Sequence, residues 1–181
     1  MRKLFFSGKE LYRILKLKNK IKKLESRLKV EININEKGTI IIFNKKKDSF
    51  AEYVASKVLE AIALGFDLNT AMQLCNTDFT LAKINAKDLV RSSRVNLAVG
   101  RVIGKKGRTK ELIGELSGCK LVVSNRTISI IGRTDNVETA RQAIISLIKG
   151  SKQSNIYNYL EKNKRRLKIL EEEKIEELIE K

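Results

Sequence analysis

Two halves of this chain carry the same apolar pattern, and this internal repetition constrains the fold more strongly than any other feature of the sequence. The alternating run at residues 30–34 matches residues 119–123, and the helical pattern of residues 55–65 matches residues 140–150. The offset between the halves changes only in loops. We therefore expect two copies of one unit of about 65 to 75 residues each, a size at which a domain is marginally stable alone.

Each half is expected to fold in the order strand, helix, turn, helix, strand, strand, helix. Alternation of apolar and polar residues predicts a strand at residues 30–34, whereas apolar residues three and four apart predict helices. Because their side chains cap helix N-termini, Asn19, Ser49 and Asp135 are expected to open helices. The other expected elements are strands at residues 4–6, 39–43, 79–85, 119–123 and 127–131, and helices at residues 11–15, 68–75, 97–103 and 108–116.

These elements predict an α+β fold of two units packed in tandem and followed by a helix. Gly65 and Gly150 are expected to end the last helix of each unit, because glycine readily adopts the left-handed conformation that closes a helix. The expected boundaries are residues 1–66 for the first unit, 67–77 for a connecting helix, 78–150 for the second unit and 151–181 for a charged helical extension.

One glycine turn, Gly104-Lys105-Lys106-Gly107, separates the first two helices expected in the second half. Because glycine has no Cβ, another backbone can approach such a turn closely. The amides that open the following helix carry the positive end of its dipole, so they favour an anion such as a phosphate. The alternative is an ordinary helix–turn–helix connection, since a chain with ten glycines can contain this spacing by chance.

Cations gather around this turn. The chain has 38 Lys and Arg against 21 Asp and Glu, a formal net charge of +17, which indicates a polyanionic partner, either nucleic acid or an acidic membrane surface. A solubilising lysine-rich surface is the plainer explanation, but the clustering favours phosphate contacts. The candidate RNA-binding residues are Arg101, Gly104, Lys105, Lys106, Gly107, Arg108, Lys110 and, in the turn between the last two strands, Arg126.

The residue types that the sequence lacks argue against several classes of function. It has no histidine, and so it lacks the commonest general base and metal ligand. Its two cysteines, Cys75 and Cys119, are too far apart for a zinc site and fit a reduced, cytoplasmic compartment. We see no signal peptide and no membrane span. We expect no enzyme activity, no catalytic residue, no metal and no cofactor.

The second half resembles a KH domain of the eukaryotic type (type I). This fold has the order β-α-α-β-β-α, a three-stranded antiparallel sheet backed by three helices, and a GXXG loop between the first two helices that clamps a nucleic-acid backbone. The stretches that carry the resemblance are Gly100 to Lys110, Ile128 to Gly132, Ala140 to Ile144 and Asn155 to Leu160. Together they are similar to the archaeal tandem form of the partner-of-Nob KH family of small-subunit ribosome biogenesis.

The resemblance implies a non-enzymatic cytoplasmic factor that binds single-stranded RNA, the 3′ region of small-subunit (pre-)rRNA, during ribosome biogenesis and rRNA processing. It also implies two protein partners, a PIN-domain endonuclease and the alpha subunit of translation initiation factor two. Two other functions stay open. One is a general KH protein acting in RNA decay or transcription, and the other is an interaction scaffold whose basic charge serves a protein or membrane partner. No membrane is among the expected partners.

The first half departs from the family pattern. Leu15-Lys16-Leu17-Lys18 stands where the second half has its glycine turn. Side chains at these positions disfavour both the turn geometry and a close backbone approach. The first unit is therefore expected to be a degenerate KH domain that has lost the phosphate clamp and serves packing or protein contact.

Two further groups of residues each allow two interpretations. Ile103, Ile113 and Leu121 form either an apolar floor for bases or part of the core. The C-terminal helix has a basic half from Lys162 to Lys168 and an acidic end. It either extends the RNA-binding surface with its basic half or is a solvent-exposed terminal helix.

Overall fold

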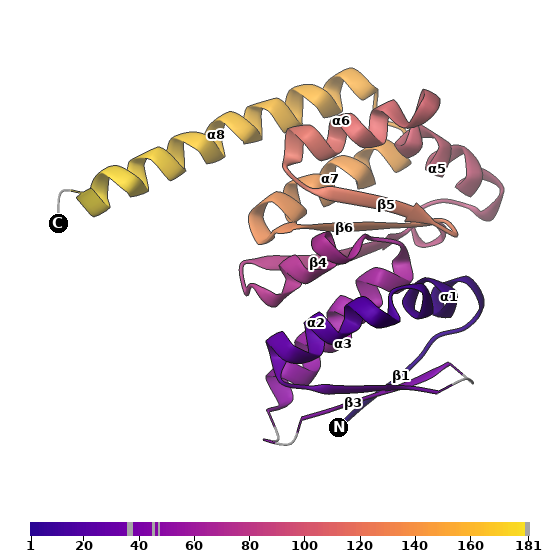
Figure 1. Cartoon of the computed structure of the whole chain (residues 1–181). Helices are drawn as coiled ribbons and strands as arrows, with labels where there is room; N and C mark the ends of the chain where they lie inside the picture. Colours follow the sequence, from indigo (N-terminus) through magenta and orange to yellow (C-terminus); the bar gives the residue numbers. More distant parts are fainter. Residues whose placement is uncertain (36–37, 45, 47, 180–181) are drawn as a thin grey trace. The chain divides into compact units, whose positions relative to one another are not determined.

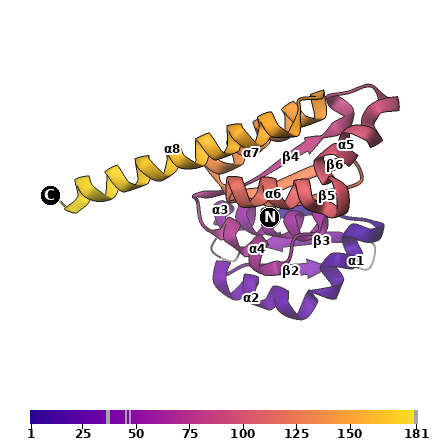
Figure 2. The ribbon, with the colours of Figure 1, turned by 90° about the horizontal axis from the view of Figure 1, so that it is seen from above.

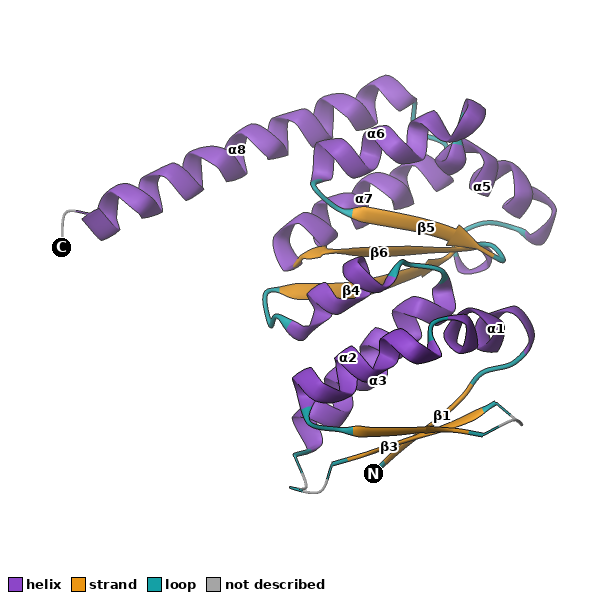
Figure 3. Ribbon diagram, in the orientation of Figure 1, coloured by secondary structure: helices purple, strands orange, loops and turns teal. Residues whose placement is uncertain are grey.

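The computed structural model describes residues 1–35, 38–44, 46 and 48–179, and of these it leaves out the side chains of residues 171 and 174–179. The chain forms two compact units, Met1–Leu81 and Ala82–Lys181, here called unit 1 and unit 2. Each unit contains helices packed on a three-stranded sheet (Figure 3). The same order of elements occurs in both, as the repeated apolar pattern predicts.

In unit 1 the last strand lies in the middle of the sheet, which has the order β1-β3-β2. Both pairings are antiparallel, with Leu4 opposite Ile40 and Ile32 opposite Ile42. The elements are β1 Arg2–Phe5, α1 Gly8–Lys16, α2 Lys18–Leu28, β2 Glu31–Ile34, β3 Thr39–Phe43 and α3 Ser49–Leu64, followed by the short α4 Leu68–Met72 and the 3-10 turn η1 Gln73–Cys75 (Figure 1).

The core of unit 1 is built from the inner side of β3 and the helices that cover it. Ile40 and Ile42 are fully buried, together with Ile14 of α1 and Leu24 of α2. Helix α3 is apolar around most of its circumference, in keeping with its ten buried residues. It ends at Gly65, whose φ of 112° closes the helix as expected from the sequence.

Unit 2 repeats this arrangement with the sheet order β4-β6-β5, in which the first three residues of β4 fall within the range of unit 1. In the antiparallel pair β5–β6, Leu121 lies opposite Ile130 and Val123 opposite Ile128. The elements are β4 Phe79–Asn85, the 3-10 turns η2 Ala86–Asp88 and η3 Ser92–Arg94, α5 Val95–Ile103, η4 Lys105–Gly107, α6 Arg108–Ser117, β5 Lys120–Ser124, β6 Thr127–Arg133 and α7 Thr134–Lys149.

A long helix, α8 (Gln153–Ile179), completes unit 2. Its first turns pack against α6 and α7, and its far end extends away from the rest of the unit (Figures 1 and 2). Ile156 and Leu160 belong to the buried core, whereas Ile169 and Leu170 are exposed. The first half of α8 is therefore part of the domain core, and its second half is not.

The α+β class, the order of elements and the C-terminal helix are confirmed, whereas three expected helix starts are wrong. Asp48, not Ser49, caps α3, because its carboxylate accepts hydrogen bonds from the amides of residues 50 and 51. Only Leu17 separates α1 from α2, so Asn19 lies inside the first turn of α2. Asp135 lies in the first turn of α7, where a carboxylate interacts favourably with the helix dipole. The exact domain boundaries remain a prediction.

Candidate nucleic-acid interface

The glycine turn of unit 2 has an unusual backbone. Gly104 (φ 73°, ψ 176°), Lys106 (φ 54°, ψ 27°) and Gly107 (φ 82°, ψ 0°) all have positive φ. For Lys106, which carries a side chain, the left-handed conformation costs about 1–2 kcal/mol. Such local strain persists only where the surrounding structure imposes it, and it is frequent at ligand-binding sites. This backbone therefore marks the turn as a candidate site on conformational grounds alone.

Two backbone amides find no acceptor inside this turn. The amide of Gly104 donates to the carbonyl oxygen of Gly100 (2.8 Å), and the amide of Gly107 donates to the carbonyl oxygen of Gly104 (3.2 Å). Lys105 and Lys106 are the first residues of η4, so the turn offers no carbonyl to their amides. Helix α6 has no side-chain cap either, because its N-cap residue is Gly107. Two amides and an uncapped helix N-terminus thus provide the donors that an anion site requires.

Gly104 lies directly against the first turn of α6. A Cβ on Gly104 would lie 2.6 Å from the Cβ of Thr109 and 2.9 Å from its backbone nitrogen, so a side chain cannot be accommodated there. Thr109 is only 4% exposed, and its hydroxyl accepts a hydrogen bond from Nε2 of Gln153, at the start of α8 (3.1 Å). Thr109 and Gln153 therefore support the turn. Sequence analysis missed both, because this contact joins residues 44 positions apart.

The charges beside the turn come mainly from exposed lysine and arginine side chains. Lys105, Lys106 and Arg108 are exposed, and Lys110 is half-buried on α6. The carboxylate of Glu111 also lies here, since a Cβ on Gly107 would be 3.8 Å from its Oε1. In the first turn of α6 this carboxylate stabilises the helix through the dipole. It also offsets part of the positive charge that attracts a phosphate.

Arg101 has a structural contact of its own. It lies in the last turn of α5, and its Nη1 is 3.3 Å from the position of a Cβ on Gly150. The guanidinium therefore lies at the C-terminal end of α7, where a cation interacts favourably with the helix dipole. Among the candidate lysine and arginine residues, Arg101 is therefore one with a stabilising contact of its own.

Arg126 lies at the end of unit 2 where α6 begins. Helix α6 and β5 each span about 15 Å, given their lengths of ten and five residues. Because the two are joined by a short turn and pack together, the far end of β5 returns to the start of α6. There Asn125 (φ 47°) and Arg126 (φ 70°) form the tight turn into β6, and Arg126 is exposed. The structure thus brings Arg126 to the same end of the unit as the glycine turn.

The three apolar residues proposed as a floor for bases differ in exposure. Ile113 is fully buried, and Leu121 is 8% exposed within the core cluster of unit 2. These two are core residues. Ile103, the last residue of α5, is 37% exposed beside the glycine turn. Of the three, only Ile103 offers a substantial apolar surface for a base to contact.

The equivalent turn in unit 1 has a different geometry. Leu17 alone connects α1 to α2, with φ −103° and ψ 9°, and its amide is bonded to the carbonyl oxygen of Ile14 (3.0 Å). No residue from 9 to 28, all of which the structure describes, has a positive φ. The α1–α2 connection of unit 1 therefore lacks the positive-φ backbone of the glycine turn, in agreement with the expectation that replacing both glycines removes this geometry.

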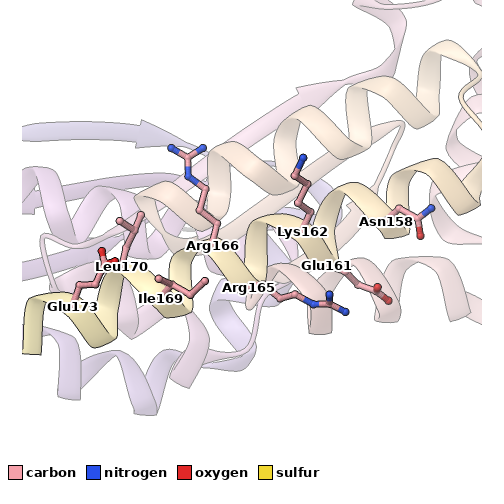
Figure 4. A pocket seen from close by; sticks show the side chains of 8 residues that line it. All are labelled: Asn158, Glu161, Lys162, Arg165, Arg166, Ile169, Leu170 and Glu173. Atoms are coloured by element: carbon pink, nitrogen blue, oxygen red, sulfur yellow. The ribbon is translucent and has the colours of Figure 1, made fainter.

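The basic half of α8 forms a separate charged surface. A shallow hollow of about 550 Å³ runs along this helix, and Figure 4 shows that the side chains around it all come from α8. Lys162, Arg165 and Arg166 contribute its positive charge. Further along, Lys168 is paired with Glu172 (3.5 Å). Glu161 and Glu173 also line the hollow, so its positive charge is partly offset at both ends.

Within the described residues, no three His, Cys, Asp or Glu side chains gather as a metal site would require. None of the described helices is both long and apolar enough to cross a bilayer. Burial raises the pKa of the Cys119 thiol to about 11, so at neutral pH it is protonated within the core.

Comparison with known proteins identifies relatives of this arrangement. Residues 80–165 match the family model for the second KH domain of PNO1, a eukaryotic-type KH domain (type I). A KH domain-containing protein of Methanocaldococcus jannaschii is 31% identical over 155 residues, which cover 83% of this chain and 68% of the relative. The pre-rRNA-processing protein pno1 of Emericella nidulans is 29% identical over 154 residues, covering 80% of this chain and 59% of the relative.

Solved structures extend the similarity to most of the chain. Dim2p from Pyrococcus horikoshii superposes with a TM-score of 0.77 at 35% identity, covering 89% of this chain and 98% of that one. A second crystal structure from the same organism is a complex of a/eIF2α, aDim2p and rRNA, with a TM-score of 0.79 at 34% identity over 91% of this chain and 94% of that one. The chain spans less than two thirds of the E. nidulans relative, so that protein contains additional sequence.

Proposed function

This chain belongs to the PNO1/Dim2 family of KH-domain proteins, and we propose that it is a non-enzymatic RNA-binding factor of small-subunit ribosome biogenesis. Its ligand is single-stranded RNA, the 3′ region of small-subunit (pre-)rRNA, held by the glycine turn of unit 2. The E. nidulans relative is a pre-rRNA-processing protein, and a related aDim2p has been crystallised with rRNA. Both support this assignment.

The observation that carries the proposal is the backbone of the glycine turn. Lys105 and Lys106 present unpaired amides at the uncapped start of α6, and Gly107 leaves the approach to them open. A KH clamp of this kind holds the backbone of about four nucleotides. Two amides and the helix dipole bind one phosphate, while the exposed lysine and arginine side chains neutralise its neighbours. Each phosphate neutralised adds about 0.7 to the salt dependence of binding a single strand.

Charge reversal at the turn tests the clamp directly. We expect Lys105→Asp with Lys106→Asp to weaken RNA binding at least about 100-fold, because it places two carboxylates where a phosphate would sit. The matched control is Lys16→Asp with Lys18→Asp, which changes the net charge equally at the equivalent turn of unit 1. The control should keep most of the affinity. Equal losses in both variants would show that the positive charge acts without a clamp.

Sequence preference separates the ribosomal role from general RNA binding. A single strand matching the 3′ end of small-subunit rRNA is titrated against a scrambled strand of the same composition, at two salt concentrations. Tighter binding of the matching strand with an equal salt slope supports base recognition beside the clamp. Equal affinities for the two strands would contradict the ribosomal role and would favour a general RNA-binding KH protein that acts in RNA decay or transcription.

We propose that the chain works in the cytoplasm with two protein partners, a PIN-domain endonuclease and the alpha subunit of initiation factor two. The rRNA complex of the Pyrococcus relative, which includes a/eIF2α, supports the second partner. Unit 1 is the better candidate for protein contact, because it exposes aromatic side chains such as Phe5 (69%) and Phe50 (61%). Substituting both by serine should weaken partner binding in a pull-down assay while RNA affinity is retained.

A further inference from the structure

Helix α8 carries a charge pattern that reverses about its middle, on the side around the shallow hollow (Figure 4). Arg165 and Arg166 lie four and three residues before Ile169. Glu172 and Glu173 lie three and four residues after it. Residues three or four apart share one face of a helix, so these residues form one surface, here called the charged face. A half-turn about Ile169 exchanges the cations of the charged face with its carboxylates.

The charged face lies on the side of α8 that unit 2 does not use for its core. Ile156 and Leu160 belong to the core, and Leu160 is only 1% exposed. Ile169 comes nine residues, or two and a half turns, after Leu160 and therefore lies on the opposite side of the helix. It is 55% exposed, Leu170 beside it is 41% exposed, and the charged residues of the face are exposed as well. An apolar centre flanked by charges is thus open to a partner.

The separation of the charges into two blocks is unfavourable for α8 alone. Like charges three or four residues apart repel each other, as Lys162 repels Arg165 and Arg166. Among the side chains that the structure describes in α8, one ion pair forms, between Lys168 and Glu172 (3.5 Å). Such an exposed pair contributes little stability, so Glu172 remains available to another cation. The charged face therefore has more charge of both signs than α8 itself neutralises.

A second copy of α8 that runs antiparallel neutralises both signs of charge at once. Its carboxylates then lie opposite Arg165 and Arg166, and its arginines lie opposite Glu172 and Glu173, as twofold symmetry requires. Ile169 meets its own counterpart on the twofold axis, which buries apolar surface at the centre of the contact. A parallel copy would instead place like charges opposite each other. The charge pattern therefore selects both the partner and its direction.

Other occupants match the charged face less well. An RNA strand or an acidic protein would pair with its arginines, but the carboxylates of the same face would repel either one. In a second copy the acidic stretch continues at residues 176–177, opposite Lys162, whereas Glu161 at the edge of the hollow weakens the pair. The far half of α8 extends away from the rest of unit 2, so a second helix can lie along residues 162–177, a length of about 22 Å (Figures 1 and 2).

We infer that the charged face of α8 is a self-association surface, through which two copies of this chain pair antiparallel about Ile169. The inference is independent of the proposed RNA-binding function, because it uses no residue of the glycine turn. A contact about 22 Å long is small compared with the interfaces of stable dimers, so the dimer is reversible. Because its ion pairs are exposed, raising the salt concentration to about 0.5 M should dissociate it.

Charge-swap variants of the full chain test the pairing by sedimentation equilibrium. Arg165→Glu with Arg166→Glu makes the charged face acidic, and Glu172→Arg with Glu173→Arg makes it basic. Each variant alone should lose at least about tenfold in dimer affinity, because like charges then lie opposite each other. An equimolar mixture of the two should form heterodimers, since every opposed pair again has opposite signs. The chain with all of these changes keeps its net charge and should dimerise within about threefold of the unchanged chain.

A disulfide bond supplies an independent readout of the twofold axis. Ile169→Cys should give disulfide-linked dimers under mild oxidation, whereas Lys164→Cys should not, because its two copies would lie about 15 Å apart along the pair. Circular dichroism checks that each variant is folded, and mass spectrometry assigns the bond. An unchanged chain that stays monomeric up to about 1 mM, or a mixture of the two swapped variants that fails to dimerise, would overturn the inference. So would equal crosslinking at both positions.

Discussion

Replacing Gly104 by alanine should destabilise unit 2 far more than replacing Gly107. With φ 73° and ψ 176°, Gly104 occupies a region that is essentially restricted to glycine, at a cost of about 1–3 kcal/mol for other residues. The new Cβ would also lie 2.6 Å from the Cβ of Thr109, well inside the usual 3.5–4.0 Å. Relieving such a clash costs about 1–3 kcal/mol. Together we expect a loss of about 3–5 kcal/mol in the free energy of unfolding.

Gly107→Ala is the matched control. Gly107 also has a positive φ (82°), but its ψ of 0° lies in the left-handed helical region and its nearest neighbour would be 3.8 Å away. We expect a net loss of about 1 kcal/mol or less, because the left-handed penalty is partly offset by the reduced freedom of the unfolded chain. The added methyl group still narrows the approach to the amides of Lys105 and Lys106, so RNA affinity should fall.

The assay is urea unfolding followed by circular dichroism, with hydrogen exchange of α6 amides to assign the transition to unit 2. The stability gap between the two alanine variants should be about 3 kcal/mol, which is over a hundredfold in the unfolding equilibrium. RNA affinity is measured at a temperature where both variants are folded. Equal stability of the two variants would refute the close contact between Gly104 and Thr109 and, with it, the proposed support of the turn.

Three further outcomes are expected, two in unit 2 and one that compares a cysteine of each unit. Glu111→Gln should strengthen RNA binding a few-fold and destabilise α6 by about 0.5 kcal/mol, because the carboxylate repels phosphate but favours the helix dipole; titration and thermal melting measure the two effects. Arg126→Gly should stabilise the hairpin by about 1 kcal/mol, because it creates the Asn-Gly pair preferred in such two-residue turns, yet weaken RNA binding. A stability gain without loss of RNA affinity would remove Arg126 from the site. At pH 8 a thiol reagent should label Cys75 before Cys119, because the Cys119 pKa of about 11 leaves almost no thiolate; mass spectrometry of the labelled peptides checks the order.

The apolar periodicity of the sequence determined the α+β class and the repeated order of elements, because each pattern lies within one helix or strand and needs no distant contact. The same holds for the glycine turn. Gly104 and Gly107 are three residues apart, and the cations beside them are neighbours in the chain. The charge cluster and the absence of histidine could likewise be recognised from the sequence alone. The N-caps at residues 17, 48 and 133 were missed by one or two residues, since capping depends on side-chain geometry.

Only the tertiary structure decided which of these residues are accessible to a ligand and which residues support the glycine turn. It buried Ile113 and left Ile103 at the surface, because only the packing of helices on the sheet determines which apolar side chain remains outside. It also placed Thr109 and Gln153 behind the glycine turn. The contact between Thr109 and Gln153 joins residues 44 positions apart, and local patterns carry no information on contacts at that range.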